Sequence, residues 1–312
     1  MNMKISLVIP FYNESEVVAV FRESILKILN QIKDADFEII CVDDGSSDDT
    51  LLQLISIVEE DGRFQVIELS RNFGKEAALT AGIDAATGDA VIPIDADLQD
   101  PPELIVEMVQ KWLDGAEVVL ARRVNRDSDT YLKRRTAEIF YRLHNRLSAV
   151  QIPENVGDFR LMDRSVVDAL KRLPEKQRFM KGLFAWVGFR TITIDYTRSP
   201  RAAGNTKFSG WKLWNFALEG ITGFSATPLK LWTYIGGMGA LFTFIYVVWV
   251  IVRTLVYGVD VPGYASLLVA VLFMGSLQLI SVGVLGEYIG RIYMETKNRP
   301  LYLIRKKHGG KL

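Results

Sequence analysis

The sequence predicts an α/β domain with a mostly parallel central sheet, followed by helices that associate with a membrane. Short apolar runs alternate with helical patterns along residues 4–121, as in a sheet whose strands are joined by helices. Two later stretches, 231–252 and 261–286, contain no charged residue, and each is long enough as a helix to cross a bilayer. The single cysteine, Cys41, excludes an intrachain disulfide and a cysteine-cluster metal site.

Five strands and four helices are expected in the first part of the chain. The strands are expected at residues 4–9, 37–42, 65–69, 90–95 and 117–121. The helices are expected at residues 15–33, 48–60, 75–86 and 102–113. Because helices separate the strands, the sheet should be parallel with right-handed crossovers, and a ligand should bind at the carboxyl ends of its strands.

Each expected helix has its own signal in the sequence. The first carries an apolar stripe of Val17, Phe21, Ile25, Ile28 and Ile32. The second has a capping residue among Ser46, Ser47 and Asp48. Gly88 can end the third helix, and Pro101-Pro102 suits the first turn of the fourth.

The net charge of the chain is zero, but the charges are unevenly distributed. Residues 1–120 carry 8 Lys and Arg against 24 Asp and Glu, whereas residues 121–312 carry 29 against 13. A basic second half should face an anionic partner. The two uncharged stretches favour a lipid bilayer over nucleic acid as that partner.

The uncharged stretches should form a transmembrane hairpin within residues 229–292, with helices at about 231–252 and 265–288; two buried core helices are the alternative. The loop 253–264 holds only Arg253 and Asp260, whereas the tail 293–312 is basic. The positive-inside rule therefore places both termini in the cytoplasm, in a multi-pass protein of the inner (plasma) membrane.

Two further segments complete the expected organisation. Residues 1–205 should form the cytoplasmic α/β domain. Residues 206–228 should form an amphipathic juxtamembrane helix in the headgroup layer, because Phe208, Trp211, Trp214, Leu218 and Ile221 recur at helical spacing. An ordinary core helix is the other interpretation of this segment.

Polar residues cluster where the expected strands end. Pro10-Phe11-Tyr12-Asn13-Glu14 follows the first strand, Asp43-Asp44-Gly45-Ser46 the second, and Asp95-Ala96-Asp97-Leu98-Gln99 the fourth. No glycine-rich dinucleotide or P-loop motif is present. Asp95, Asp97 and Gln99 offer hard oxygen ligands that suit Mg²⁺ or Mn²⁺ bridging a diphosphate.

With these motifs, the chain resembles the family-2 glycosyltransferases of GT-A fold, in particular those that use a polyprenyl phosphate. The resemblance is carried by Leu7-Val8-Ile9-Pro10-Phe11-Tyr12-Asn13-Glu14, Val42-Asp43-Asp44-Gly45-Ser46, Arg71-Asn72-Phe73-Gly74-Lys75, Asp95-Ala96-Asp97-Leu98-Gln99-Asp100-Pro101-Pro102 and Gly157-Asp158-Phe159-Arg160. The expected hairpin, with Gly286-Glu287-Tyr288-Ile289-Gly290-Arg291 near its end, is similar to the bacterial bactoprenol glucosyltransferase branch.

The resemblance implies a role for each matching position. The nucleotide sugar would contact Pro10, Tyr12, Glu14, Asp43, Asp44, Lys75, Asp95, Ala96, Arg201 and Lys207. The metal would be held by Asp95, Asp97 and Gln99, and the catalytic residues would be Asp158 and Asp95. Arg123 and Arg135, from a segment rich in arginine and lysine, would bind the lipid phosphate.

The implied reaction is inverting transfer of a sugar to undecaprenyl or another polyprenyl phosphate on the cytoplasmic leaflet. UDP-glucose is the preferred donor, with GDP-mannose or a UDP-aminoarabinose derivative as alternatives. A processive polysaccharide synthase is disfavoured, because the chain lacks a Q-x-x-R-W stretch. A non-catalytic membrane scaffold is the alternative of another class. Glycines in the hairpin, such as Gly236, Gly237 and Gly283, would allow close helix contact in a homo-oligomer.

Overall fold

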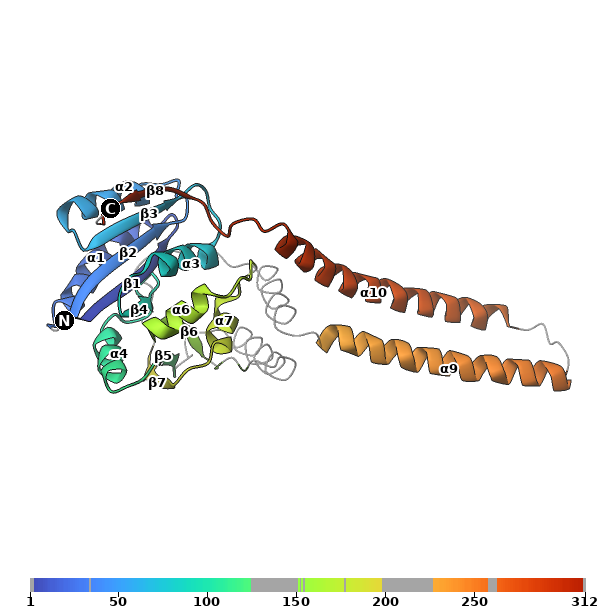
Figure 1. Cartoon of the computed structure of the whole chain (residues 1–312). Coiled ribbons are helices and arrows are strands. Elements are labelled where there is room, and N and C mark those ends of the chain that lie inside the picture. The colour runs from blue at the N-terminus through green and yellow to red at the C-terminus, as the bar shows by residue number, and fades with distance from the viewer. Residues whose placement is uncertain are drawn as a thin grey trace.

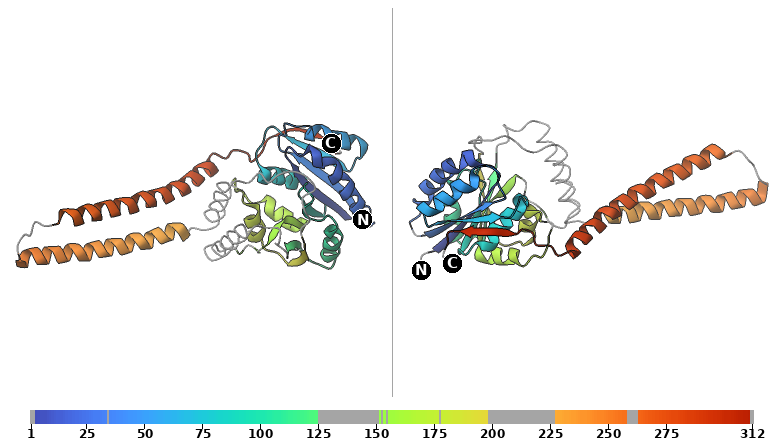
Figure 2. Two further views of the ribbon diagram at one scale, coloured as in Figure 1. Left: turned by 180° about the vertical axis from the view of Figure 1, so that it is seen from behind. Right: turned by 90° about the horizontal axis from the view of Figure 1, so that it is seen from above.

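The computed structural model of the chain describes residues 3–33, 35–124, 151, 153, 155–176, 178–197, 227–257 and 263–310. An α/β unit occupies one end of the molecule, and two long helices extend from it side by side (Figure 1). Figure 2 shows from two further directions that this pair of helices projects away from the sheet.

The structure confirms the five strands and four helices expected between residues 4 and 121. They are β1 (Met3–Phe11), α1 (Ser15–Leu29), β2 (Ala35–Asp43), α2 (Thr50–Glu60), β3 (Phe64–Leu69), α3 (Lys75–Ala85), β4 (Ala90–Pro93), α4 (Leu104–Leu113) and β5 (Val118–Arg123). The later elements are β6 (Val156–Asp163), α6 (Arg164–Lys171), α7 (Met180–Trp186), β7 (Thr191–Tyr196), α9 (Thr227–Tyr257), α10 (Tyr264–Thr296) and β8 (Ile304–His308).

Two predicted helix ends are wrong. The N-cap position of α2 is Asp49 rather than Ser46, Ser47 or Asp48, although Oδ1 of Asp48 does accept a hydrogen bond from the amide of Thr50, the first residue of α2, at 3.1 Å. The third helix ends at Ala85, before Gly88. Gly88 instead packs where a side chain would meet the backbone of Ser6 on β1, so its small size serves sheet packing rather than helix termination.

The eight strands form one sheet in the order β7-β5-β6-β4-β1-β2-β3-β8. The pairs among β4, β1, β2 and β3 are parallel, as is the pair of β5 with β7. Only β6 and β8 run antiparallel to their neighbours. The predicted mostly parallel sheet is therefore confirmed, and the carboxyl ends of its parallel strands lie at one edge.

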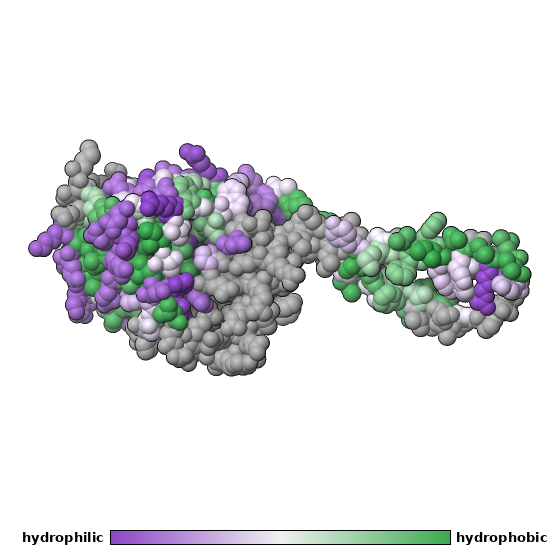
Figure 3. All heavy atoms as spheres, turned by 90° about the horizontal axis from the view of Figure 1, so that it is seen from below, coloured by the Kyte–Doolittle hydropathy of each residue, from purple (hydrophilic) through white to green (hydrophobic). Residues whose placement is uncertain are grey.

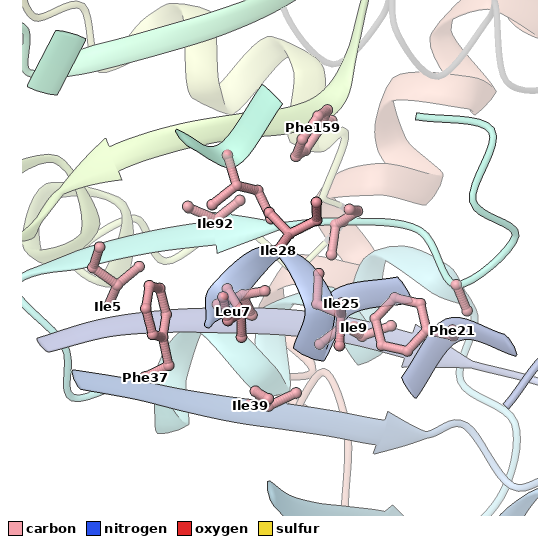
Figure 4. Packing of buried hydrophobic residues seen from close by; sticks show 14 of the residues in the cluster. Ile5, Leu7, Ile9, Phe21, Ile25, Ile28, Phe37, Ile39, Ile92 and Phe159 are labelled. Atoms are coloured by element: carbon pink, nitrogen blue, oxygen red, sulfur yellow. The ribbon is translucent and has the colours of Figure 1, made fainter. Parts of the chain in front are cut away.

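Both faces of the sheet are covered by helices. Side chains alternate along a strand, so Leu7 and Ile9 of β1 pack on one face against Phe21 and Ile25 of α1 (Figure 4). The intervening Val8 packs on the other face, in a cluster that includes residues of α3, α6 and α7. The strands are thus buried on both faces, as parallel strands usually are.

The helices α9 and α10 form a hairpin whose described surface is largely hydrophobic (Figure 3). Within the described residues, one segment, Ala270–Thr296, is long and apolar enough to cross a membrane, and Tyr234–Tyr246 in α9 is a shorter apolar segment. Two complete membrane spans are therefore not established. Glu287 and Arg291, one helical turn apart on α10, form an ion pair at 2.9 Å.

The tail after the hairpin has structure that the sequence analysis did not assign. The helix α10 continues to Thr296, and Ile304–His308 forms β8, which pairs antiparallel with β3. Glu68 of β3 contacts two side chains of this strand, Arg305 at 3.3 Å and His308 at 3.2 Å. The end of the basic segment 293–312 therefore returns to the α/β unit.

Candidate active site

The expected site residues lie along the carboxyl edge of the sheet. Pro10 and Asp43 lie at the ends of β1 and β2, and Asp95 follows β4 by two residues. Because β6 runs antiparallel to β4, its beginning lies at this same edge, and Asp158 is its third residue. The topology therefore brings Asp158 beside Asp95, although 62 positions separate them in the sequence.

One ammonium group joins the two carboxylates that were expected to be catalytic. The Nζ atom of Lys75 lies 2.7 Å from Oδ1 of Asp95 and 2.9 Å from Oδ2 of Asp158. Lys75 is the first residue of α3, so the loop that precedes this helix sets its position. The side chain of Lys75 is 46% exposed, whereas that of Asp158 is only 15% exposed.

Asp158 is surrounded by positive charge. Burial alone would raise the pKa of Asp158, but Lys75, Lys181 and Arg160 lower it well below its ordinary value. Its Oδ2 atom contacts Lys75, while its buried Oδ1 atom has no hydrogen-bond partner among the described residues. Asp158 is therefore an ionised carboxylate with one oxygen available to a ligand.

The pKa of a second carboxyl group, that of Glu76 beside Asp158, is shifted in the opposite direction. Burial and the negative charge of Asp158 raise the pKa of Glu76 to about 8, against a lowering effect of Lys75. Within the described part of the chain, its buried Oε2 atom has no hydrogen-bond partner. At neutral pH, Glu76 is therefore mainly protonated.

Arg160 and Lys181 complete this group of charges. Burial lowers the pKa of Arg160 to about 10, and Asp158 opposes that effect, so the guanidinium remains charged at neutral pH. It lies 4.0 Å from the ring centre of Phe184 on α7 and donates from Nη2 to the carbonyl of Gly157 at 2.7 Å. The sequence did not indicate Glu76 and Lys181 as site residues, because they come close to Asp158 only when α3 packs on β1 and β2 and α7 packs on β6. Arg160, two residues after Asp158 on β6, was also missed as a site residue.

The part of the edge where the nucleotide was expected contains Asp43 and Asp44, which are 1% and 3% exposed. Asp44 accepts hydrogen bonds from the amides of Phe73 at 2.7 Å and Gly74 at 2.9 Å. Burial raises the pKa of both carboxyl groups, although their hydrogen bonds oppose this. Gly45, with φ of +69°, allows this loop to approach Arg71, where a Cβ atom would lie 2.5 Å from a backbone carbon.

The expected metal ligands follow β4. The Oδ1 atom of Asp97 accepts a hydrogen bond from the amide of Gln99 at 3.1 Å, and Ala96 between the two aspartates is buried. The described residues include no group of three or more His, Cys, Asp or Glu side chains placed to hold a metal. The oxygen donors of Asp95, Asp97 and Gln99 suit Mg²⁺ or Mn²⁺, provided that a ligand such as a diphosphate supplies further oxygens.

The remaining residues that were expected at the site lie in loops and at strand ends, or lie outside the described residues. Tyr12, which is 40% exposed, and Glu14 lie in the loop after β1. Arg123 ends β5, and its amide donates to the carbonyl of Asn155 at 3.0 Å. The described residues do not include Arg135, Arg201 and Lys207, nor the segment 206–226 of the expected amphipathic helix.

Comparison with known families shows the class of this protein. Residues 6–171 match Glycosyl transferase family 2, and residues 227–292 match the GtrB C-terminal hairpin. The chain belongs to glycosyltransferase family 2. The resemblance stated from the sequence motifs is thus confirmed, and the α/β unit with its mostly parallel sheet is the expected GT-A-like fold of this enzyme family.

Relatives of this glycosyltransferase match it over nearly its whole length. It is 54% identical over 308 residues to the SfII prophage-derived bactoprenol glucosyl transferase of Shigella flexneri, with 99% of each chain covered. It is 52% identical over 304 residues to the prophage bactoprenol glucosyl transferase homolog of Escherichia coli K12, covering 97% of this chain and 99% of that one. An uncharacterized glycosyltransferase of Bacillus subtilis, YkcC, is 44% identical over 308 residues, covering 99% and 95%.

Proposed function

We propose that this glycosyltransferase transfers glucose from UDP-glucose to undecaprenyl or another polyprenyl phosphate at the cytoplasmic face of the membrane. The likeness to bactoprenol glucosyl transferases over 99% of both chains carries the proposal. That likeness includes both the α/β unit and the hairpin. The product would be a lipid-phosphate sugar, available to enzymes that modify cell-envelope glycans.

The acceptor chemistry agrees with the charges at the site. An oxygen of the lipid phosphate attacks the anomeric carbon, and the bond from that carbon to the departing UDP breaks. A phosphate monoester has a second pKa of about 6, so its attacking oxygen is mostly ionised at neutral pH. The reaction therefore needs no strong base, which suits the strongly lowered pKa of Asp158. Asp158 would instead orient the reacting groups and stabilise positive charge on the sugar.

The donor would lie across the ends of β1, β2 and β4. Asp43 and Asp44 would face the nucleoside, with Pro10, Tyr12 and Glu14 from the neighbouring loop. Asp95, Asp97 and Gln99 would hold Mg²⁺ or Mn²⁺ on the diphosphate; such an ion offsets charge on the leaving group. Lys75, already paired with Asp95 at 2.7 Å, would lie beside that diphosphate.

The hairpin would hold the enzyme at the bilayer where its lipid acceptor resides. Both α9 and α10 would cross the membrane, and the α/β unit and both termini would lie in the cytoplasm. The amphipathic segment 206–228 would lie in the headgroup layer, and Arg123 and Arg135 would contact the lipid phosphate, with Arg201 and Lys207 closing over the donor. A homo-oligomer through the glycines of the hairpin is part of this proposal.

Purified protein in detergent would test the reaction with undecaprenyl phosphate and a panel of labelled UDP- and GDP-sugars. Each donor is incubated with Mg²⁺, Mn²⁺ or EDTA, and label entering the organic phase is counted. We expect metal-dependent transfer from UDP-glucose. Transfer from GDP-mannose or a UDP-aminoarabinose derivative instead would retain the reaction class and change the sugar.

A matched variant separates an enzyme from a scaffold that merely retains the fold. Asp97→Asn preserves the shape of the side chain and removes one metal-binding charge, and it should abolish transfer. A folded protein that labels no lipid with any donor would contradict the proposed acceptor. Unchanged transfer in Asp97→Asn would contradict the proposed metal site.

A further inference from the structure

The end of the hairpin is joined to the α/β unit by specific side-chain contacts. After α10 the chain runs back over the α/β unit as far as β8 (Figure 1). Glu295, in the last turn of α10, is half-buried, and its Oε1 atom accepts a hydrogen bond from the backbone amide of Lys176 at 2.8 Å. The hydroxyl of Tyr302 donates a hydrogen bond to Oδ2 of Asp84 at 2.9 Å. The two contacts reach two different elements, the connection between α6 and α7 and the helix α3.

Glu295 contacts the connection between α6 and α7 at Lys176. The side chain of Arg178 donates to the carbonyls of Leu173 at 2.9 Å and Glu175 at 3.4 Å, so the two ends of this connection are tied to each other. A displacement at Lys176 is therefore passed on to the start of α7.

The start of α7 lies at the proposed reaction centre. The buried residue Met180 donates a hydrogen bond from its amide to the carboxyl group of Glu76. The next residue, Lys181, is one of the cations that lower the pKa of Asp158. The contact of Glu295 thus leads, through one short connection, to a charge that acts on Asp158.

Tyr302 contacts the other helix beside the reaction centre, α3. It packs against the hydrophobic cluster that contains the buried residues of this helix, and its partner Asp84 lies in the last turn of α3. Lys75, which contacts both Asp95 and Asp158, is the first residue of the same helix. Because a helix is a rigid element, a contact at one end of α3 also constrains the position of Lys75 at the other end.

We propose that Glu295 and Tyr302 are positioning residues for the reaction centre. Glu295 fixes the place of Lys181 through α7. Tyr302 fixes the place of Lys75 through α3. Small displacements matter at such a site, because a misplacement of about 1 Å by a distant substitution can lower a rate about 100-fold.

This inference gives the hairpin a part in catalysis in addition to its proposed place in the bilayer. The charges around Asp158 are correctly arranged only when the end of α10 is seated on the α/β unit. The inference rests on the proposed function, because its kinetic test uses transfer of glucose from UDP-glucose to undecaprenyl phosphate.

A double-mutant cycle on the full-length protein in detergent tests the role of Glu295, with rates expressed per amount of folded protein. Glu295→Ala should lower kcat about tenfold, because packing still holds α7 near its place, and it should leave the KM for UDP-glucose unchanged. Glu295→Gln keeps an acceptor oxygen for the Lys176 amide and should restore most of the rate. In a Lys181→Met background, Glu295→Ala should lower kcat less than about twofold further, because the side chain through which it acts is already absent.

A second cycle tests Tyr302. Tyr302→Phe removes only the hydroxyl and should lower kcat about fivefold, as expected for the loss of one hydrogen bond. In a Lys75→Met background it should cause no further loss. Tyr293→Phe is the matched control, because it removes the same group from an exposed tyrosine of α10, and it should behave as wild type.

Hydrogen exchange followed by mass spectrometry tests the contact of Glu295 without any substrate. Peptides from the connection between α6 and α7 should exchange faster in Glu295→Ala than in wild type, because the Lys176 amide loses its acceptor. In Glu295→Gln the exchange should be close to that of wild type.

The possible results separate this inference from the proposed function. Absence of transfer by the wild type from any donor would contradict the proposed function and not the contacts, which hydrogen exchange tests by itself. Unchanged exchange of the connection in Glu295→Ala would overturn the inference whatever the activity. An equal loss of kcat on Glu295→Ala in the wild-type and Lys181→Met backgrounds would also overturn it, since Glu295 would then act independently of Lys181.

Discussion

Asp44 and Asp158 are both carboxylates at the carboxyl edge of the sheet, but their partners differ in kind. Asp44 accepts hydrogen bonds from the backbone amides of Phe73 and Gly74. Asp158 instead contacts the Lys75 side chain at 2.9 Å, with Arg160 and Lys181 nearby. The proposed nucleotide side is therefore fixed through the backbone, whereas the proposed reaction centre depends on side-chain charges.

This difference predicts different consequences of substitution in the two regions. A change at Asp44 leaves backbone amides without partners, which costs folding free energy. A change at Lys75 or Asp158 alters a charge balance at the proposed reaction centre, which should cost activity more than stability.

Lys75→Met should have the largest effect. Among the described residues, Lys75 is the one cation that contacts both Asp95 and Asp158, and we expect its loss to lower kcat/KM for transfer at least about 100-fold. Far-UV circular dichroism should show an unchanged fold. Lys75→Arg retains the charge and should recover part of the rate. More than a tenth of wild-type activity in Lys75→Met would contradict the central position of this ammonium.

Asp44→Ala should have the largest effect on stability. Two buried amides lose their acceptor, which we expect to lower the free energy of unfolding by about 3 kcal/mol. Denaturant unfolding in detergent measures the change. Asp158→Asn is the matched comparison, and transfer should be lost. Because Lys75, Lys181 and Arg160 lower the pKa of Asp158, its charge also stabilises the folded state at neutral pH, so this variant should lose stability as well. Retention of transfer in Asp158→Asn would remove the distinction between the regions.

Much of the nucleotide side could be predicted from the sequence, because its signals are local. Apolar runs in the sequence predict the strands. Residues at or just after the ends of these strands, such as Asp43 and Asp95, lie at the predicted edge of the sheet. The charges around Asp158 could be predicted only in part, since Glu76 and Lys181 lie on α3 and α7, and only the tertiary fold brings these two helices to Asp158. The strand β8 had no local signal at all, because Arg305, Lys306 and Lys307 give it a strongly polar sequence.

A substitution at Gly309, directly after β8, tests whether this strand stabilises the edge of the sheet at β3. Its φ is +72°, and a Cβ atom there would lie 2.4 Å from Cγ1 of Val58. Gly309→Ala should therefore destabilise the protein by about 2 kcal/mol. Gly310→Ala, with φ of +82° but no neighbour closer than 3.3 Å, controls for backbone strain and should cost about 1 kcal/mol. Because Lys75 is untouched, kcat at low temperature should be retained in both variants.

The effect of Glu76→Gln on stability should depend on pH, and at pH 5 it should be the smallest of these effects. The pKa of Glu76 rises from its ordinary value of 4.5 to about 8 in the folded protein. Between those values the folded state holds more protons than the unfolded state, so this group lowers stability progressively as pH rises from 4.5 to 8. Glutamine, which is neutral at every pH, removes that loss.

The thermal midpoint of Glu76→Gln should therefore be close to that of wild type at pH 5. It should rise progressively above that of wild type up to pH 8, because wild type loses up to about 1.4 kcal/mol of stability per pH unit in this range. Comparing the two proteins at each pH cancels the other titrating groups. A constant difference in thermal midpoint from pH 5 to pH 8 would mean that Glu76 is ionised in the folded protein, beside the carboxylate of Asp158.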